Sequence, residues 1–177
     1  MQEMNKNVEK KIKAIDTFLD LFLDDYGEKI NWTETQRKIA YTIVLQKDYT
    51  DGKDRCGIIC PTQYGKSTIA SCAIILRTII FKDKFTVIGG TERKTRIIGR
   101  YAIKHLFDNE VFTSQLNYRK SQLDRLKNEV NKERIDLKNG GCITFLTADY
   151  KNEKRIGETL LGEGSKNILL DDSVLCG

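Results

Sequence analysis

The chain has few of the residues that bind zinc. Its 177 residues include one histidine, His105, and five cysteines, at positions 56, 60, 72, 142 and 176. The cysteines form no C-x-x-C pair, and His105 has no companion at ligand spacing. Because structural zinc needs closely spaced Cys or His ligands, this pattern argues against a zinc site. We expect reduced, buried thiols in a cytosolic protein instead.

A long uninterrupted hydrophobic run is also missing near the N-terminus. The apolar residues there are interrupted by four aspartates, namely Asp16, Asp20, Asp24 and Asp25. Charges at this spacing exclude the hydrophobic core of a signal peptide and a membrane-spanning helix in this stretch. We therefore expect a soluble protein that is not secreted and has no membrane partner.

Neither sign of charge dominates the composition. There are 30 Lys and Arg against 25 Asp and Glu, which gives a net charge of +5. That balance is compatible with an anionic partner such as DNA, but it is common among proteins that bind no nucleic acid. Internal repeats, low-complexity tracts and long linkers are absent from the sequence, and 40% of its residues are hydrophobic. These features predict a single globular domain.

A phosphate-binding loop is predicted at residues 61–67. Its sequence is Pro61-Thr62-Gln63-Tyr64-Gly65-Lys66-Ser67. The unpaired N–H groups of the first turn of a helix, together with the helix dipole, attract anions. Gly65 would let the backbone approach phosphate, Lys66 would reach the β- and γ-phosphates, and the Ser67 hydroxyl would coordinate Mg²⁺.

The surroundings of this loop support the prediction more than the loop itself does. The full pattern G-x-x-x-x-G-K-[ST] has a glycine where Cys60 stands, so the match is incomplete. However, the apolar run Gly57-Ile58-Ile59-Cys60 before the loop predicts a strand, and the apolar periodicity from Thr68 predicts a helix. Strand, loop and helix in this order are typical of nucleotide-binding sites.

Helices and strands are expected to alternate along the rest of the chain. Helices are predicted over 6–26, 68–81 and 91–108, and a further helix begins at a capping box formed by Thr33 and Gln36. Strands are predicted over 85–88 and 167–170, and a β-hairpin is predicted around Asn139-Gly140-Gly141. This alternation predicts an α/β fold with a mostly parallel sheet.

Asp171 and Asp172 follow the last predicted strand. A carboxylate at the carboxyl end of a buried strand can face a phosphate loop on a neighbouring strand and hold Mg²⁺, a role that Asp171 fits. Hydrolysing ATPases normally have a glutamate next, which orients or deprotonates the attacking water. Asp172 is one methylene shorter, which puts hydrolysis in question. The alternative is an acidic pair that ends the strand and caps a helix.

The order of these features resembles the ATPase domain of tailed-phage terminase large subunits, the motors that drive DNA into the procapsid. The resemblance covers residues from about 33 to 175, and its most specific parts are the hairpin at 135–145 and the segment 161–173. It implies a P-loop NTPase fold of the RecA/ASCE-like class. Residues 1–50 would be an N-terminal helical segment, and residues 55–177 would be the nucleotide-binding core of one partial ATPase domain.

The resemblance also assigns residues to an ATP site. Gln36 would contact adenine, although its place in the capping box gives it a structural alternative. ATP would be bound by Gln36 and by Pro61, Thr62, Gln63, Tyr64, Gly65, Lys66, Ser67 and Thr68. Ser67 and Asp171 would hold Mg²⁺, while Lys66 and Asp172 would act in catalysis. Arg155, in a charged loop, would be an arginine finger or else a solvated side chain.

The implied function is ATP hydrolysis coupled to translocation of double-stranded DNA in the cytoplasm of the infected host. The portal, the small terminase subunit and further copies in a homo-oligomeric ring would be the partners. Two alternatives stay open. In related ATPases a strand after the acidic one inserts beside the phosphate-loop strand, and neither this strand nor the nuclease domain is found in the sequence. The missing strand and the shortened Asp172 make a non-catalytic nucleotide-binding or assembly fragment one alternative. A helicase-type ATPase, which shares the phosphate loop, is the other.

Basic residues recur on the predicted helix 91–108. Arg93, Arg96, Arg100 and Lys104 are spaced so that they can share one helix face. They could contact DNA phosphates or form an ordinary solvated face. No aromatic residues alternate with them in a way that suggests stacking on single-stranded bases.

Overall fold

The structure is a computed structural model and describes most of the chain. The described residues are 2–50, 52, 56–61, 63–89, 91–119, 121–123, 126, 134–147 and 167–170. In chain order the elements are α1 (Gln2–Leu19), α2 (Glu34–Leu45), the 3-10 helix η1 (Gln46–Asp48), α3 (Lys66–Phe81), β1 (Lys84–Gly89), α4 (Glu92–Asp108), α5 (Glu110–Thr113), β2 (Arg134–Asp136), β3 (Cys142–Thr147) and β4 (Asn167–Leu170). None of the helices described is long and apolar enough to cross a bilayer.

The described strands form a mostly parallel four-stranded sheet in the order β2-β3-β1-β4. β1 pairs in parallel with both β3 and β4, and β2 pairs antiparallel with β3. The register sets Ile88 of β1 beside Leu170 of β4, and Gly89 beside Thr147 of β3. The predicted α/β fold with a mostly parallel sheet is therefore confirmed.

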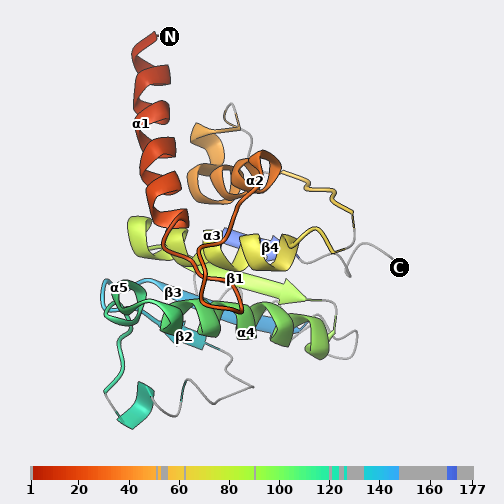
Figure 1. Cartoon of the computed structure of the whole chain (residues 1–177), viewed down its shortest axis with the longest axis vertical. Helices are drawn as coiled ribbons and strands as arrows, with labels where there is room; N and C mark the ends of the chain where they lie inside the picture. Colours follow the sequence, from red (N-terminus) through yellow and green to blue (C-terminus); the bar gives the residue numbers. More distant parts are fainter. Residues whose placement is uncertain are drawn as a thin grey trace.

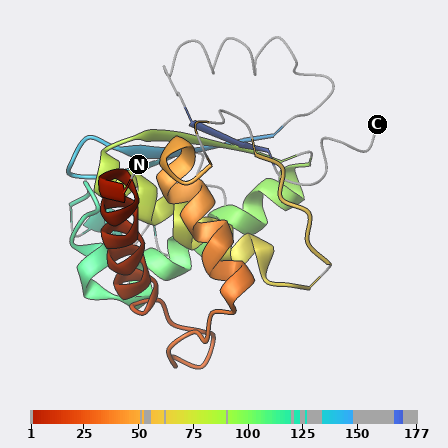
Figure 2. The same ribbon diagram turned by 90° about the horizontal axis from the view of Figure 1, so that it is seen from above.

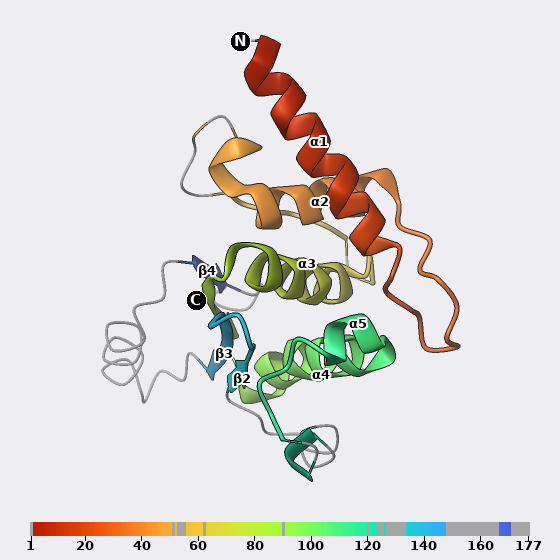
Figure 3. The same ribbon diagram turned by 90° about the vertical axis from the view of Figure 1, so that its left-hand side faces the viewer.

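The described helices form layers on one face of this sheet (Figures 1 and 2). α3 and α4 lie next to the strands, α2 packs on α3, and α1 packs against both α2 and α3 (Figure 3). One cluster of buried apolar side chains runs through these layers, from Ile15 and Leu19 of α1 to Ile143 of β3. The N-terminal helices thus share a hydrophobic core with the sheet.

The predicted hairpin is confirmed, and its turn also supports α3. Gly140 has a φ of +88°, which a residue without a side chain adopts without strain. The Asn139 amide nitrogen donates to the backbone oxygens of Thr78 (3.1 Å) and Ile79 (2.8 Å), near the carboxyl end of α3. Its oxygen accepts from the N–H of Gly141 (2.8 Å). The turn therefore satisfies carbonyl groups that the end of a helix leaves without partners.

The helix predicted over 6–26 was too long, because α1 ends at Leu19. The indole N–H of Trp32 donates to the carbonyl oxygen of Leu19 (3.0 Å), so a residue from the following segment satisfies the helix end. The Asp24 carboxylate accepts from the backbone N–H groups of Tyr26 (2.8 Å) and Glu28 (2.9 Å), which forms a turn. Such side-chain to backbone bonds compete with the helix ladder, and apolar periodicity does not report them.

The strand predicted at Gly57-Ile58-Ile59-Cys60 was also wrong, since no strand is assigned there. Ile59 is fully exposed and Ile58 is 38% exposed. β4 forms the edge of the described sheet, and this segment pairs with none of the described strands. An apolar run indicates a tendency to be buried, but a strand also needs a neighbour for its backbone N–H and C=O groups.

His105 is buried in α4, and neither of its ring nitrogens has a hydrogen-bond partner among the described residues. Its ring lies edge-on to the ring of Phe22. Burial and, to a smaller extent, the charge of Lys104 lower the pKa of His105 to about 4. Asp108, whose carboxylate is 3.7 Å from Nδ1, and Asp25 act in the opposite direction. At neutral pH the native state therefore contains the neutral ring.

Replacement of this residue, His105→Leu, is expected to remove part of the acid sensitivity of folding. Between pH 6.5 and about 4 the unfolded state binds a proton that the native state does not. The free energy of unfolding of the wild type should therefore decrease as pH falls through this window, by about 3 kcal/mol in total. Denaturant titrations at a series of pH values should show this loss in the wild type only. Parallel pH profiles for the two proteins would contradict the role of His105.

Candidate phosphate-binding site

The predicted phosphate loop lies at the sheet edge where the parallel strands end. A short turn connects the end of α3 to the start of β1, so the helix returns along the sheet and its N-terminus lies near the carboxyl end of β1 (Figure 1). β3 and β4 are parallel to β1 and end at the same edge. Ligands of open α/β folds bind at this edge.

Gly65 immediately precedes α3 in the left-handed conformation, with φ +72° and ψ 21°. Its carbonyl accepts from the N–H of Ile69 (3.0 Å), which is the first helical bond of α3. Lys66, Ser67 and Thr68 form the first turn and are half-buried. This turn carries a cation and two hydroxyl groups and no acidic residue, so its charge favours an anion.

Gln36 connects the loop to the start of α2. The capping box is confirmed: the Thr33 hydroxyl accepts from the Gln36 N–H, and the Gln36 side-chain oxygen accepts from the Thr33 N–H (2.9 Å). The Gln36 amide nitrogen also donates to the carbonyl oxygen of Tyr64 (2.9 Å). The structural role predicted for Gln36 is therefore present, and the same side chain contacts the phosphate loop.

A second contact joins the same two segments. The hydroxyl groups of Tyr64 and Thr33 lie 3.1 Å apart and share a hydrogen bond. Hydrogen bonds with Thr33 and, next, with Thr35 lower the pKa of Tyr64. Sequence reasoning missed this pair. Only the nearness of the capping box to the loop could have indicated it, and that nearness is a property of the folded chain.

Of the predicted site residues, the structure brings together Gln36, Tyr64 and Gly65. Pro61 and Gln63 are exposed, and Gln63 has a positive φ of 64°. Four predicted residues lie outside the described residues, namely Thr62, Arg155, Asp171 and Asp172. The strand register gives the position of the residue that precedes the acidic pair. This residue, Leu170, lies beside Ile88, near the carboxyl end of β1. Leu170, the last residue of β4, thus lies at the edge that contains the loop.

The basic side chains of α4 differ in their surroundings. Arg93 and Arg100 are exposed. Lys104 forms ion pairs with Asp25 and Asp108, each at 3.2 Å, and donates to the backbone oxygen of Asp24 (3.0 Å). Lys104 therefore joins α4 to the segment that follows α1 instead of extending a row of cations toward solvent.

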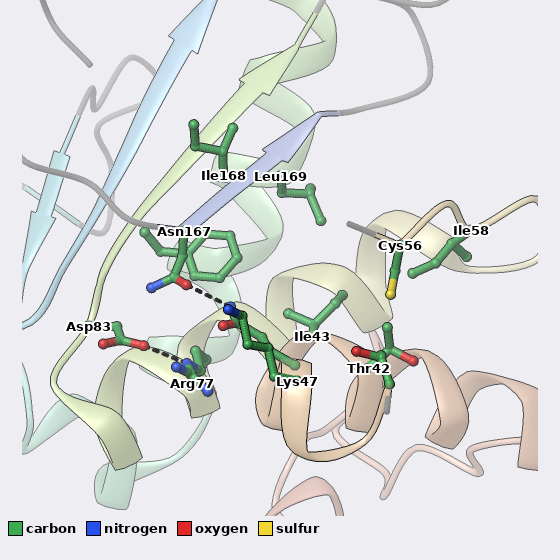
Figure 4. Close-up of a pocket in the computed structure, with 13 residues that line it drawn as sticks. Thr42, Ile43, Lys47, Cys56, Ile58, Arg77, Asp83, Asn167, Ile168 and Leu169 are labelled. Carbon is green, nitrogen blue, oxygen red and sulfur yellow. Dashed lines mark hydrogen bonds and ion pairs between the residues drawn. The ribbon is translucent and has the colours of Figure 1, made fainter. Parts of the chain in front are cut away.

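A cavity of about 480 Å³ lies beside the outer edge of β4 (Figure 4). It is bordered by α2, the 56–58 segment, the carboxyl-terminal half of α3 and the starts of β1 and β4. Gln46 donates to Asn167 across one side of it (2.7 Å), and Arg77 pairs with Asp83 on another. None of the predicted site residues that the structure describes lines this cavity, so it is separate from the described part of the candidate site.

Comparison with known proteins adds no further assignment, because no protein-family model matches the chain and no curated protein matches it.

Proposed function

We propose that the chain binds Mg-ATP at the 61–67 loop and is the ATPase part of a DNA-packaging terminase large subunit. The observation that supports this proposal best is the position of Gly65-Lys66-Ser67. These residues begin α3 with a left-handed glycine, at the sheet edge where β1, β3 and β4 end. Backbone N–H groups at such a helix start are suited to bind phosphate.

In the proposed site each of a few residues has a separate role. Lys66 would bind the β- and γ-phosphates, and Ser67 and Asp171 would hold Mg²⁺, which neutralises the charge that develops on the transferred phosphoryl group. Asp172 would orient the attacking water, and Arg155 would act on the nucleotide of a neighbouring copy. Double-stranded DNA, the portal and the small terminase subunit would be the partners of the assembled ring.

A second candidate is a non-catalytic nucleotide-binding or assembly part of such a motor. The exposure of Ile58 and Ile59 favours it, because the segment before the loop is outside the described sheet. A phosphate loop that no paired strand supports is held less rigidly, and phosphoryl transfer depends on positioning. The side chain of Asp172, one methylene shorter than that of glutamate, would also position the attacking water less well.

Loss of the loop lysine, Lys66→Ala, is expected to weaken ATP binding about 10- to 100-fold. A charged hydrogen bond to phosphate contributes on the order of 1.5–3 kcal/mol, and the variant removes it. The measurement is titration with a fluorescent ATP analogue in the presence of Mg²⁺. Lys82→Ala is the matched control, because Lys82 is exposed at the opposite end of α3. Unchanged affinity in Lys66→Ala would contradict the proposed function.

Steady-state release of phosphate from ATP distinguishes the two candidates. If the chain is an ATPase, the wild type should turn over, and Asp172→Ala should reduce the rate by at least about 100-fold, since a positioned base contributes on the order of 10²–10⁴. Asp172→Glu restores the usual side-chain length and should not reduce the rate. Binding without turnover in all three proteins would favour the non-catalytic candidate.

A further inference from the structure

We propose that Gln36 positions the phosphate loop and does not select the base of the nucleotide, so that the site binds ATP and GTP with similar affinity. The inference rests on the proposed binding of nucleotides at the loop. Both the oxygen and the nitrogen of the Gln36 side chain have defined partners within the protein, and these contacts limit what else the side chain can bind.

The hydrogen-bonding capacity of Gln36 is mostly used within the protein. Its side-chain oxygen accepts from the Thr33 N–H at 2.9 Å, and the Thr33 hydroxyl lies 3.2 Å from the same oxygen. Its nitrogen donates one hydrogen to the Tyr64 carbonyl. A glutamine amide recognises adenine by accepting from the N6 amino group and donating to N7. The backbone and hydroxyl of Thr33 occupy the accepting side, so an N6 amino group could be bound only if the capping box opened.

The remaining donor of Gln36 cannot distinguish the two purines. One N–H of the side-chain amide is left after the bond to Tyr64. A single donor can bind N7, and N7 is an acceptor in both adenine and guanine. Adenine and guanine differ at positions 1, 2 and 6, and the occupied oxygen of Gln36 is not available to the group at position 6, which lies beside N7.

The contact with Tyr64 sets the direction of the loop backbone. The C=O of one residue and the N–H of the next point in opposite directions across a trans peptide. Since the Tyr64 carbonyl points to Gln36, the N–H of Gly65 points away from α2. A Cβ atom at Gly65 would lie only 3.0 Å from the Gln36 amide nitrogen. Gln36 therefore packs directly on the loop and orients a backbone donor that could bind phosphate.

The N-terminal helices make this support rigid. Arg37, next to Gln36, pairs with Asp16 of α1 at 2.8 Å, and the Tyr41 hydroxyl donates to the same carboxylate at 2.6 Å. The start of α2, which contacts the loop through Gln36 and Thr33, is thus fixed to α1. Donors that are held in place before the ligand arrives bind it more tightly, because less conformational entropy is lost.

The test compares the affinities of the wild type and of Gln36→Met for three ligands. This variant keeps the length of the side chain and adds no charge. The ligands are ATP, GTP and inorganic tripolyphosphate, which has no base. The wild type should bind ATP and GTP within about threefold of each other. Gln36→Met should weaken the binding of all three ligands by the same factor, about five- to tenfold, as expected for the loss of the hydrogen bond to the Tyr64 carbonyl. Glu34→Gln is the control, because Glu34 is exposed in the same helical turn and contacts Lys38.

The ligand pattern separates the possible failures. One contrary result is that Gln36→Met loses affinity for ATP alone, and another is that it loses affinity for both nucleotides but not for tripolyphosphate. Either result would show that Gln36 binds the base and would overturn the inference. If the wild type and Gln36→Met bound each ligand with the same affinity, the inference would be overturned as well. A wild type that binds none of the three would contradict the proposed function itself.

Amide hydrogen exchange tests the positioning role without any ligand. The backbone N–H groups at residues 63–65 should exchange faster in Gln36→Met than in the wild type or in Glu34→Gln, while the amides in the middle of α3 stay unchanged. A side chain that only caps α2 would not alter exchange in the loop. Equal exchange at residues 63–65 in all three proteins would therefore overturn the inference, whatever the nucleotide affinities are.

Discussion

The burial of α3 governs how the neighbouring helices and the sheet are arranged. Half of its 16 residues are buried, and they contact α2, α4 and the sheet. A helix that is enclosed on several sides can neither rotate nor shift without exposing apolar surface or opening cavities. Its two ends are fixed as a result, and each end has a distinct role. The N-terminus presents the candidate phosphate loop, and the carboxyl end is bound by the hairpin turn.

The carboxyl end of α3 shows how separate parts of the chain converge on this helix. The Asn139 side chain satisfies two carbonyl groups of its last turn, and Arg77 joins the carbonyl of Val44 to the carboxylate of Asp83. Buried polar groups without partners cost free energy, so these bonds allow the helix to end inside the protein. The same bonds fix where β1 begins, and they thereby set the register of the sheet relative to the helix.

The candidate site depends on contacts between α2 and the loop as much as on the loop sequence. Two hydrogen bonds, from Gln36 and between the hydroxyl groups of Thr33 and Tyr64, connect the start of α2 to the residues just before α3. On the other side of the site, the edge strand β4 leaves Ile168 and Leu170 about half exposed. In the described part of the chain, the loop is therefore supported by a helix start and not by a strand of the sheet.

Features that depend on residues close together in the chain could be predicted before the fold was known. The capping box joins residues three apart, the hairpin turn follows from Asn139-Gly140-Gly141, and α3 and β1 follow from local periodicity. Three other features became visible only in the folded chain: the end of α1, where Trp32 binds the carbonyl of Leu19; the exposure of Ile59 outside the described sheet; and the contact of Gln36 with the loop. Each of these depends on a partner that is distant in the chain or on whether a neighbouring strand is present. Periodicity and propensity carry no information about such partners, because they report only how a segment tends to fold and which of its faces is apolar.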